Sequence, residues 1–311
     1  MATYKTQEDM LKEAINSILN QSYKNIELII VCDGEREEYE KIKKMNEPKI
    51  KVLLNEKNRG LPYSLNRAIR NATGDYIARM DSDDISVSNR IEKQVKFLEE
   101  HEDIGVCGTE AILFGEKKGK KRIYLKNEEQ IKIQLLYRAT LIHPTVMIRR
   151  NVFEEYEYNE QFIYAQDFEL WSRVSEKFKI AILPITGLKY RVHGQQVSIN
   201  KQQKQADLSK EIIKNNAKKI TGQYDERIYQ TLYILSGREK LTYKNYIEIS
   251  ENIDYIIKKN TKYNLVDLKK VLYNRFFELV VKNKILPFKF TALKKCFKIY
   301  NLEEIIEGLK R

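Results

Sequence analysis

The chain of 311 residues is poor in cysteine, proline and glycine, with 3 Cys, 5 Pro and 12 Gly. The three cysteines (Cys32, Cys107 and Cys296) are an odd number and lack the close spacing of zinc ligands. This pattern excludes a disulfide framework and argues against a zinc site, and it fits a reducing compartment. Low Pro and Gly content, together with 20 Tyr and 11 Phe, excludes collagenous, low-complexity and disordered chains.

Long hydrophobic runs are also missing. No stretch of 18 apolar residues exists, so no transmembrane helix is expected. Met1 and Ala2 are followed by Thr3, Tyr4 and Lys5, which is not the pattern of a secretory signal peptide. The sequence therefore predicts a cytoplasmic protein, one that at most touches the inner face of the cell membrane.

Positive charge is concentrated in the last third of the chain. Residues 201–311 carry 24 Lys and Arg against 13 Asp and Glu, or +11, which leaves +1 of the total of +12 for residues 1–200. We expect two domains, a neutral one over residues 1–204 and a basic helical one over residues 205–311. A basic region suits phosphate groups on lipid or nucleic acid. Nucleic acid is not favoured as a partner, because the lysines alternate with acids and no recognition signature or stacking platform is present.

Residues 1–110 alternate short strand-like apolar runs with amphipathic helical patterns. Helices are expected at 8–20, 39–45, 62–71 and 90–100, and strands at 26–34, 49–55, 75–84 and 104–114. A strand, turn and second strand are expected over 180–194, and helices almost throughout from residue 205. This order predicts an α/β fold, a doubly wound and mostly parallel sheet flanked by helices, with a C-terminal all-helical region. Ligands of such sheets bind at the carboxyl ends of the strands.

Three carboxylates follow the apolar run at 75–80: Asp81, Asp83 and Asp84, with Ser82 among them. On an extended chain the side chains of Asp81 and Asp83 would lie roughly 7 Å apart. Mutual repulsion would raise their pKa values unless a cation were bound, and oxygen ligands suit Mg²⁺ or Mn²⁺. The alternative is a cluster at the N-terminus of the helix expected at 90–100.

Four other polar motifs each have a structural and a functional interpretation. Asp33-Gly34 is a plain turn or a strand-end site, and Asn58-Arg59-Gly60 is a loop or an anion contact. Asp167, between aromatic residues, is a helix N-cap or a base with a raised pKa. Arg191 and His193 share one strand face, where they suit a diphosphate or a metal, although His193 alone is more often structural.

Taken together, the segments resemble glycosyltransferase family 2 over residues 1–200. The resemblance rests on nine successive segments, among them IELIIVCDG, NRGLPYSLNRAI, ATGDYIARMDSDD, AQDFELWSRV and YRVHGQQVS. It implies the GT-A fold and transfer, with inversion, of a sugar from a nucleotide diphosphate that is expected to be UDP. A saccharide or lipid-linked glycan acceptor, and a role in bacterial surface polysaccharide or lipopolysaccharide synthesis, follow from the same resemblance.

The resemblance also assigns roles residue by residue. It makes Asp167 the general base, and it places a divalent metal, Mn or Mg, on Asp83, with Asp81 and His193 beside it. The residues expected around the nucleotide sugar are Ala2, Thr3, Tyr4, Asp33, Asn58, Gly60, Asp81, Ser82 and Arg191. Two positions depart from the family pattern, since Cys32 and Gln166 stand where acids are usual. A catalytically impaired, nucleotide-sugar-binding member of the family is therefore the alternative.

Two expectations concern the ends of the chain. Lysines at 282–298 alternate with apolar residues at 288–300, which favours a helical appendage on an anionic membrane surface near a lipid-linked acceptor. The alternative is a helical subdomain packed on the catalytic sheet, or a dimer contact. At the other end, a strand that starts at Met1 would have only three or four residues, against a usual five or six. We favour a start upstream of Met1 over a tolerated short strand.

Overall fold

The computed structural model describes residues 1–121, 125, 127–194 and 201–285. Contacts divide the chain into two compact units, one of residues 1–125 and 140–205, the other of residues 126–139 and 206–311. The division at 205/206 falls next to the domain boundary expected at 204/205. The sequence did not indicate that residues 126–139 join the second unit.

The first unit opens with three parallel strands. They are β1 (Ala2–Thr3), β2 (Leu28–Asp33) and β3 (Ile50–Asn55), in the order β1-β2-β3. Every residue of β2 is buried, because successive side chains point to opposite, equally covered faces. Leu28 and Ile30 pack against helix α1 (Glu8–Leu19), and Ile29 packs against helix α3 (Leu61–Arg70). Helix α2 (Arg36–Lys43) connects β2 to β3.

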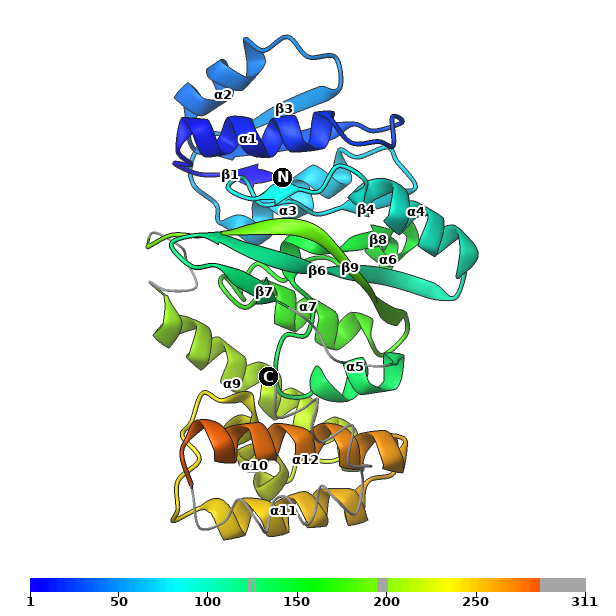
Figure 1. The fold of residues 1–311 in the computed structure, drawn as a ribbon, viewed down its shortest axis with the longest axis vertical. Coiled ribbons are helices and arrows are strands. Elements are labelled where there is room, and N and C mark those ends of the chain that lie inside the picture. The colour runs from blue at the N-terminus through cyan, green and yellow to red at the C-terminus, as the bar shows by residue number, and fades with distance from the viewer. Residues whose placement is uncertain (122–124, 126, 195–200, 286–311) are drawn as a thin grey trace. The chain divides into compact units, whose positions relative to one another are not determined.

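A second sheet completes the unit (Figure 1). Its order is β4 (Tyr76–Ala78), β8 (Met147–Arg149), β6 (Ile104–Gly115), β9 (Lys179–Val192) and β5 (Ile85–Ser86), with β7 (Gly119–Lys121) paired to β6. Only β6 and β9 pair in parallel here, and the other pairs are antiparallel. A parallel bridge between Ala2 and Asp81 joins the two sheets. The α/β class is confirmed, and among the described strands parallel pairing is found in β1–β3, in this bridge and in β6–β9.

Short helices cover this second sheet. They are α4 (Arg90–Glu100), the 3₁₀ turn η1 (His143–Thr145), α6 (Arg150–Glu155) and α7 (Gln166–Val174). Ile91, Val95 and Leu98 of α4 form one apolar cluster with β6 and β8. The fully buried Arg90 donates to the carbonyl oxygens of Arg79 at 2.7 Å and of Pro144 at 2.8 Å. One guanidinium therefore braces the chain just before the acidic cluster against the η1 turn.

Two local expectations are wrong. Residues 75–84 are not one strand, because β4 ends at Ala78 and only Asp81 makes a further bridge. Residues 179–192 form a single strand, β9, where a turn between two strands was expected. Register shifts against β6 near Thr109 and Glu110 absorb the irregularity around Pro184 without breaking the strand.

The second unit is helical, as predicted. It contains α5 (Glu128–Gln134), most of α9 (Gln202–Thr221), α10 (Glu226–Ser236), α11 (Tyr246–Lys259) and α12 (Leu265–Lys282). Asn127, Asp225 and Asn264 cap the first turns of α5, α10 and α12 through their side-chain oxygens. No helix in the described parts of the chain is long and apolar enough to cross a membrane. The expected membrane-binding pattern beyond residue 285 lies outside the described residues.

Candidate active site

An acidic cluster follows strand β4. Ligand oxygens of Asp81, Asp83 and Asp84 all lie within 4.8 Å of one another, closer than an extended chain would hold them. Helix α4 begins only at Arg90, after Asn89, so the alternative interpretation as an N-terminal helix cluster is wrong. The backbone turns instead, and it gathers the three carboxylates beside the first strand.

Asp84 is the most buried of the three, at 1% exposure. Burial, followed by the charges of Asp81 and Asp83, raises its pKa to about 8. Its Oδ1 accepts the backbone N–H of Arg191 at 2.8 Å, and its Oδ2 has no hydrogen-bond partner among the described residues. A buried carboxylate oxygen without a donor, next to two further carboxylates, fits a hard divalent cation. The sequence marked Asp84 as part of the acidic cluster, but the family resemblance gave it no role of its own.

Asp81 forms an ion pair with the buried Arg79. Burial raises the pKa of Asp81, Arg79 opposes that shift, and the charge of Asp83 adds to it. The reasoning from sequence also missed Arg79, which precedes the motif and has no special spacing. Its guanidinium holds Asp81 at the junction of the two sheets.

His193 and Arg191 of the β9 end reach the same cluster. His193 Nε2 lies 3.0 Å from Asp83 Oδ2. Arg191 Nε donates to the Asp83 carbonyl oxygen at 2.7 Å, and its Nη2 forms an ion pair with Glu13. The structure thus brings the expected metal residues together. In this arrangement Arg191 holds the 83–84 backbone in place.

The end of β1 lies next to this cluster through the bridge from Ala2 to Asp81. Thr3 Oγ1 donates to Glu38 Oε2 at 3.1 Å, while Tyr4 is exposed. The hydroxyls of Thr6 and Ser82 lie 2.8 Å apart, and Glu38 Oε1 accepts the Thr6 N–H at 2.8 Å. Glu38, on α2, was not predicted to take part because nothing in its local sequence marks it.

Asp33 organises the loop that precedes α3. Its Oδ1 accepts from Asn55 Nδ2 at 2.7 Å and from the Arg59 N–H at 2.8 Å, and its Oδ2 accepts the Gly60 N–H at 2.8 Å. Gly34 has φ +91°, and a Cβ there would lie 2.5 Å from the Asn58 backbone nitrogen, so only glycine fits. Asn58 itself is exposed. The two loops expected near the nucleoside are therefore joined.

Asp167 lies in the first turn of α7, whose N-cap is Ala165, so the interpretation of Asp167 as the N-cap is wrong. Its carboxylate is half-buried. Burial raises the pKa of the Tyr158 hydroxyl. The charge of Arg79 opposes that shift, and the charges of Asp167 and Asp81 add to it. The buried hydroxyl of Tyr158 lies 2.8 Å from His143 Nε2, within hydrogen-bond distance.

Comparison with known proteins agrees with this geometry. The model of the family described as Glycosyl transferase family 2 matches residues 1–157. The chain belongs to glycosyltransferase family 2. The family resemblance and the GT-A fold expected from the sequence are both confirmed.

Relatives of this family 2 glycosyltransferase include an uncharacterised glycosyltransferase of Methanocaldococcus jannaschii, 33% identical over 66% of this chain and 73% of that protein. The amylovoran biosynthesis glycosyltransferase AmsE of Erwinia amylovora is 28% identical over 62% of this chain and 75% of its own.

Among solved structures, S. aureus TarS 1–349 in complex with UDP has a TM-score of 0.59 at 17% identity, covering 96% of this chain and 87% of that one. The mannosyltransferase PcManGT of Pyrobaculum calidifontis, in complex with GDP-Man and Mn²⁺, has a TM-score of 0.52 at 14% identity, covering 99% and 77%.

Proposed function

We propose that this family 2 glycosyltransferase moves a sugar, with inversion, from a UDP-sugar to a hydroxyl of a saccharide or lipid-linked glycan. The observation that carries the proposal is the convergence of Asp81, Asp83 and Asp84 beside the β1 end. A TarS structure in complex with UDP and the amylovoran enzyme support the donor and the polysaccharide setting. We assign catalysis to residues 1–204 and leave residues 205–311 as a basic helical region.

The acidic cluster is proposed to hold a divalent cation, Mn²⁺ or Mg²⁺, through Asp81, Asp83 and the unpartnered oxygen of Asp84. The cation, when bound, neutralises charge on the diphosphate as it leaves. His193 keeps Asp83 oriented through its 3.0 Å contact. Arg191 fixes the backbone of the same two aspartates.

The nucleoside is proposed to lie along the β1 end and the loop after β3. Ala2, Thr3 and Tyr4 supply one side of this surface, and Asn58 and Gly60 the other. Asp33 is engaged by three donors from the 55–60 segment, so its contribution is to shape the surface. Ser82, tied to Thr6, fixes the position of the acidic turn against β1.

Asp167 is proposed to be the general base. As the bond between the acceptor oxygen and the sugar carbon forms, the bond to the diphosphate oxygen breaks, and the acceptor proton passes to the Asp167 carboxylate. One base and a single displacement invert the sugar carbon, as in other inverting sugar chemistry. The buried Gln166 beside it leaves Asp167 without the acidic neighbour that is usual in the family.

A nucleotide-sugar screen by thermal shift with Mn²⁺ tests this proposal. A donor at a hundred times its dissociation constant stabilises by about 2.7 kcal/mol, and the same donor should then be consumed in the presence of a glycan acceptor. Stabilisation without turnover, over a broad acceptor set, would favour the alternative of an impaired binding protein. The absence of any Mn²⁺-dependent stabilisation by UDP or UDP-sugars would contradict the proposed donor class.

A further inference from the structure

Two exposed lysines flank one apolar side chain of β6 on the second sheet. Ile112 of β6 pairs with Lys120 of β7 on one side and with Lys189 of β9 on the other. Side chains at directly paired positions leave the same face of a sheet, so the three form a row across three strands. Ile112 is 37% exposed and both lysines are exposed. We name these three residues the lysine row.

The lysine row lies on the face of the sheet that serves the acidic cluster. Lys189 precedes Arg191 by two residues on β9, so their side chains leave the same face, roughly 7 Å apart. Arg191 Cζ lies 4.4 Å from the ring centre of Phe114, its paired residue on β6, which agrees with a shared face. The same guanidinium donates to the Asp83 carbonyl oxygen. The lysine row is therefore beside the proposed cation site.

The hairpin that carries Lys120 is anchored at the same place. At its tip, the N–H of Glu116 donates to the carbonyl oxygen of Val192 at 3.0 Å. The Oε1 of Glu116 accepts the N–H of Gly194 at 3.1 Å. His193, which lies between these two residues of β9 and its end, belongs to the proposed cation site. The fold thus fixes the hairpin to the chain segment that contacts the acidic cluster.

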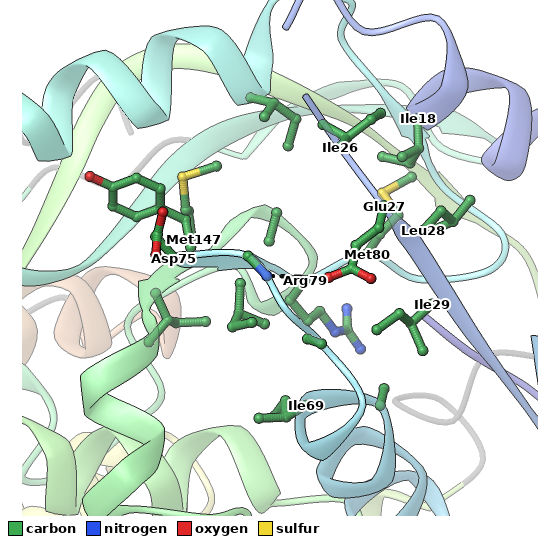
Figure 2. Close-up of a pocket in the computed structure, with 18 of the residues that line it drawn as sticks. Ile18, Ile26, Glu27, Leu28, Ile29, Ile69, Asp75, Arg79, Met80 and Met147 are labelled. Atoms are coloured by element: carbon green, nitrogen blue, oxygen red, sulfur yellow. Dashed lines mark hydrogen bonds between the residues drawn. The ribbon is translucent and has the colours of Figure 1, made fainter. Parts of the chain in front are cut away.

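The arginines near the cluster are engaged, whereas the two lysines are not. Arg79 forms an ion pair with Asp81 and lines the cavity of Figure 2, where most of the surrounding side chains are apolar. Arg191 forms an ion pair with a glutamate of α1. Within the part of the chain that the structure describes, neither Lys120 nor Lys189 forms an ion pair. Their ammonium groups are available to a ligand.

The spacing of the two lysines suits a phosphate group. Neighbouring strands lie about 5 Å apart, so the stems of Lys120 and Lys189 are separated by roughly 10 Å. Flexible four-carbon side chains allow both ammonium groups to approach one anion from opposite sides. Lysine binds phosphate as a point charge with three N–H donors. Ile112 between them offers an apolar surface for the carbon face of a sugar ring.

We propose that the lysine row binds a phosphate ester carried by the acceptor, so that the acceptor is an anionic saccharide. In the proposed function the donor diphosphate belongs to the cation on the acidic cluster, which leaves the lysine row for a second anion. The assignment of this anion to the acceptor rests on the proposed function, but the anion site itself does not.

Titration with glucose 1-phosphate, followed by ³¹P NMR, tests the site in protein that already holds saturating UDP and Mg²⁺. In Lys120→Gln/Lys189→Gln, the Kd should rise at least ~10-fold, because both charge-assisted hydrogen bonds are lost. Lys120→Arg/Lys189→Arg keeps both charges, so its Kd should stay within about threefold of that of the wild type. The matched control is Lys93→Gln/Lys96→Gln, which removes two exposed lysines of α4 and should leave the Kd unchanged.

The proposal is overturned if the wild type does not bind glucose 1-phosphate, or if the Gln variant of the lysine row binds it equally well. Equal binding of glucose and glucose 1-phosphate would overturn it too, because the site would then not recognise an anion. Failure to bind UDP would instead contradict the proposed donor class and leave the anion site standing.

Two further measurements identify the source of the phosphate. The wild type should show a lower KM for phosphate-bearing acceptors than for the same acceptors after dephosphorylation, and the Gln variant should lose this difference. Equal KM values in the wild type would overturn the acceptor role. Flotation with anionic vesicles should be the same for the wild type and the Gln variant, and loss of flotation in the variant would assign the lysine row to lipid headgroups instead.

Discussion

Asp83 is assigned to cation binding and Asp167 to proton transfer, so substitutions of the two residues should have different effects on donor binding and on turnover. Asp83→Ala removes an oxygen of the cation site, and we expect loss of both metal-dependent donor binding and transfer. Asp167→Asn keeps the shape but cannot accept a proton, so donor affinity should stay within about twofold while kcat falls at least ~100-fold. Calorimetry with donor and Mn²⁺, alongside turnover at saturating donor, measures both effects.

The outcome that contradicts the assignment of Asp167 is near-normal turnover by Asp167→Asn at saturating donor. Glu169→Gln serves as the matched control. Glu169 lies on the same helix and its carboxylate is bound by Arg173 at 2.6 and 2.7 Å, so this change should affect stability more than catalysis.

Asp84 should make cation binding depend on pH. Its pKa of about 8 in the folded protein means that the carboxyl holds a proton below that pH, and a cation must displace this proton. Affinity for Mn²⁺ should therefore fall as the pH drops from 8 to 6, by up to about tenfold per unit. Titrations at pH 6, 7, 8 and 9 measure the effect. In Asp84→Asn we expect weaker Mn²⁺ binding whose affinity changes less with pH. Equal Mn²⁺ affinities of the wild type at pH 6 and pH 8 would contradict this role of Asp84.

At the scale of elements, the loop before α3 depends on one carboxylate. Asp33→Ala removes an acceptor that binds Asn55 and the N–H groups of Arg59 and Gly60. Hydrogen bonds to charged groups contribute about 1.5–3 kcal/mol each, so urea unfolding should show a loss of at least ~2 kcal/mol. Donor KM should rise more than kcat falls, because the loop is assigned to the nucleoside and takes no part in the proposed proton transfer.

Asp33→Asn is the conservative comparison for this loop. It retains one acceptor oxygen, so its stability should lie between those of the wild type and Asp33→Ala. Equal stability of all three proteins would show that the loop is held by its own backbone conformation.

Elements with a clear periodic pattern of hydrophobic residues were predictable from the sequence, and elements defined by contacts between distant residues were not. The expected helix at 90–100 matches α4, and the helix at 8–20 ends one residue later than α1. The turn of residues 79–84 could not be foreseen, because the bridge from Asp81 to Ala2 and the bonds from Arg90 and Arg191 impose it. The bridge from Asp81 to Ala2 and the bond from Arg191 to Asp84 join residues far apart in the chain.

The same distinction applies to the candidate site. Asp81, Asp83 and His193 were found because the order of the family's motifs placed them, and the structure brings them together. Glu38 and Arg79 were missed since each acts through a neighbour that only the fold supplies. The roles of Asp167 and of the nucleoside surface stay predictions.

At the scale of the whole molecule, the uneven charge predicts binding to anionic lipid. Residues 201–311 carry +11 and residues 1–200 carry +1, and each basic residue near such a surface contributes about 1 kcal/mol at most. We expect the protein to float with vesicles that contain anionic lipid at low salt and to be released from them at high salt. It should not bind neutral vesicles. Flotation without a preference for anionic vesicles would rule this out.

The placement of α5 has a consequence for how the protein is made. Gln130, at its start, donates to Asp267 of α12 at 2.7 Å across 137 residues of chain, and the buried Ile131 and Ile133 belong to the same helical unit. Translation at about 5–20 residues per second separates the emergence of these partners by on the order of ten seconds. During that interval the two isoleucines of α5 lack the helices that later bury them, which makes α5 a natural point for chaperone engagement on the ribosome.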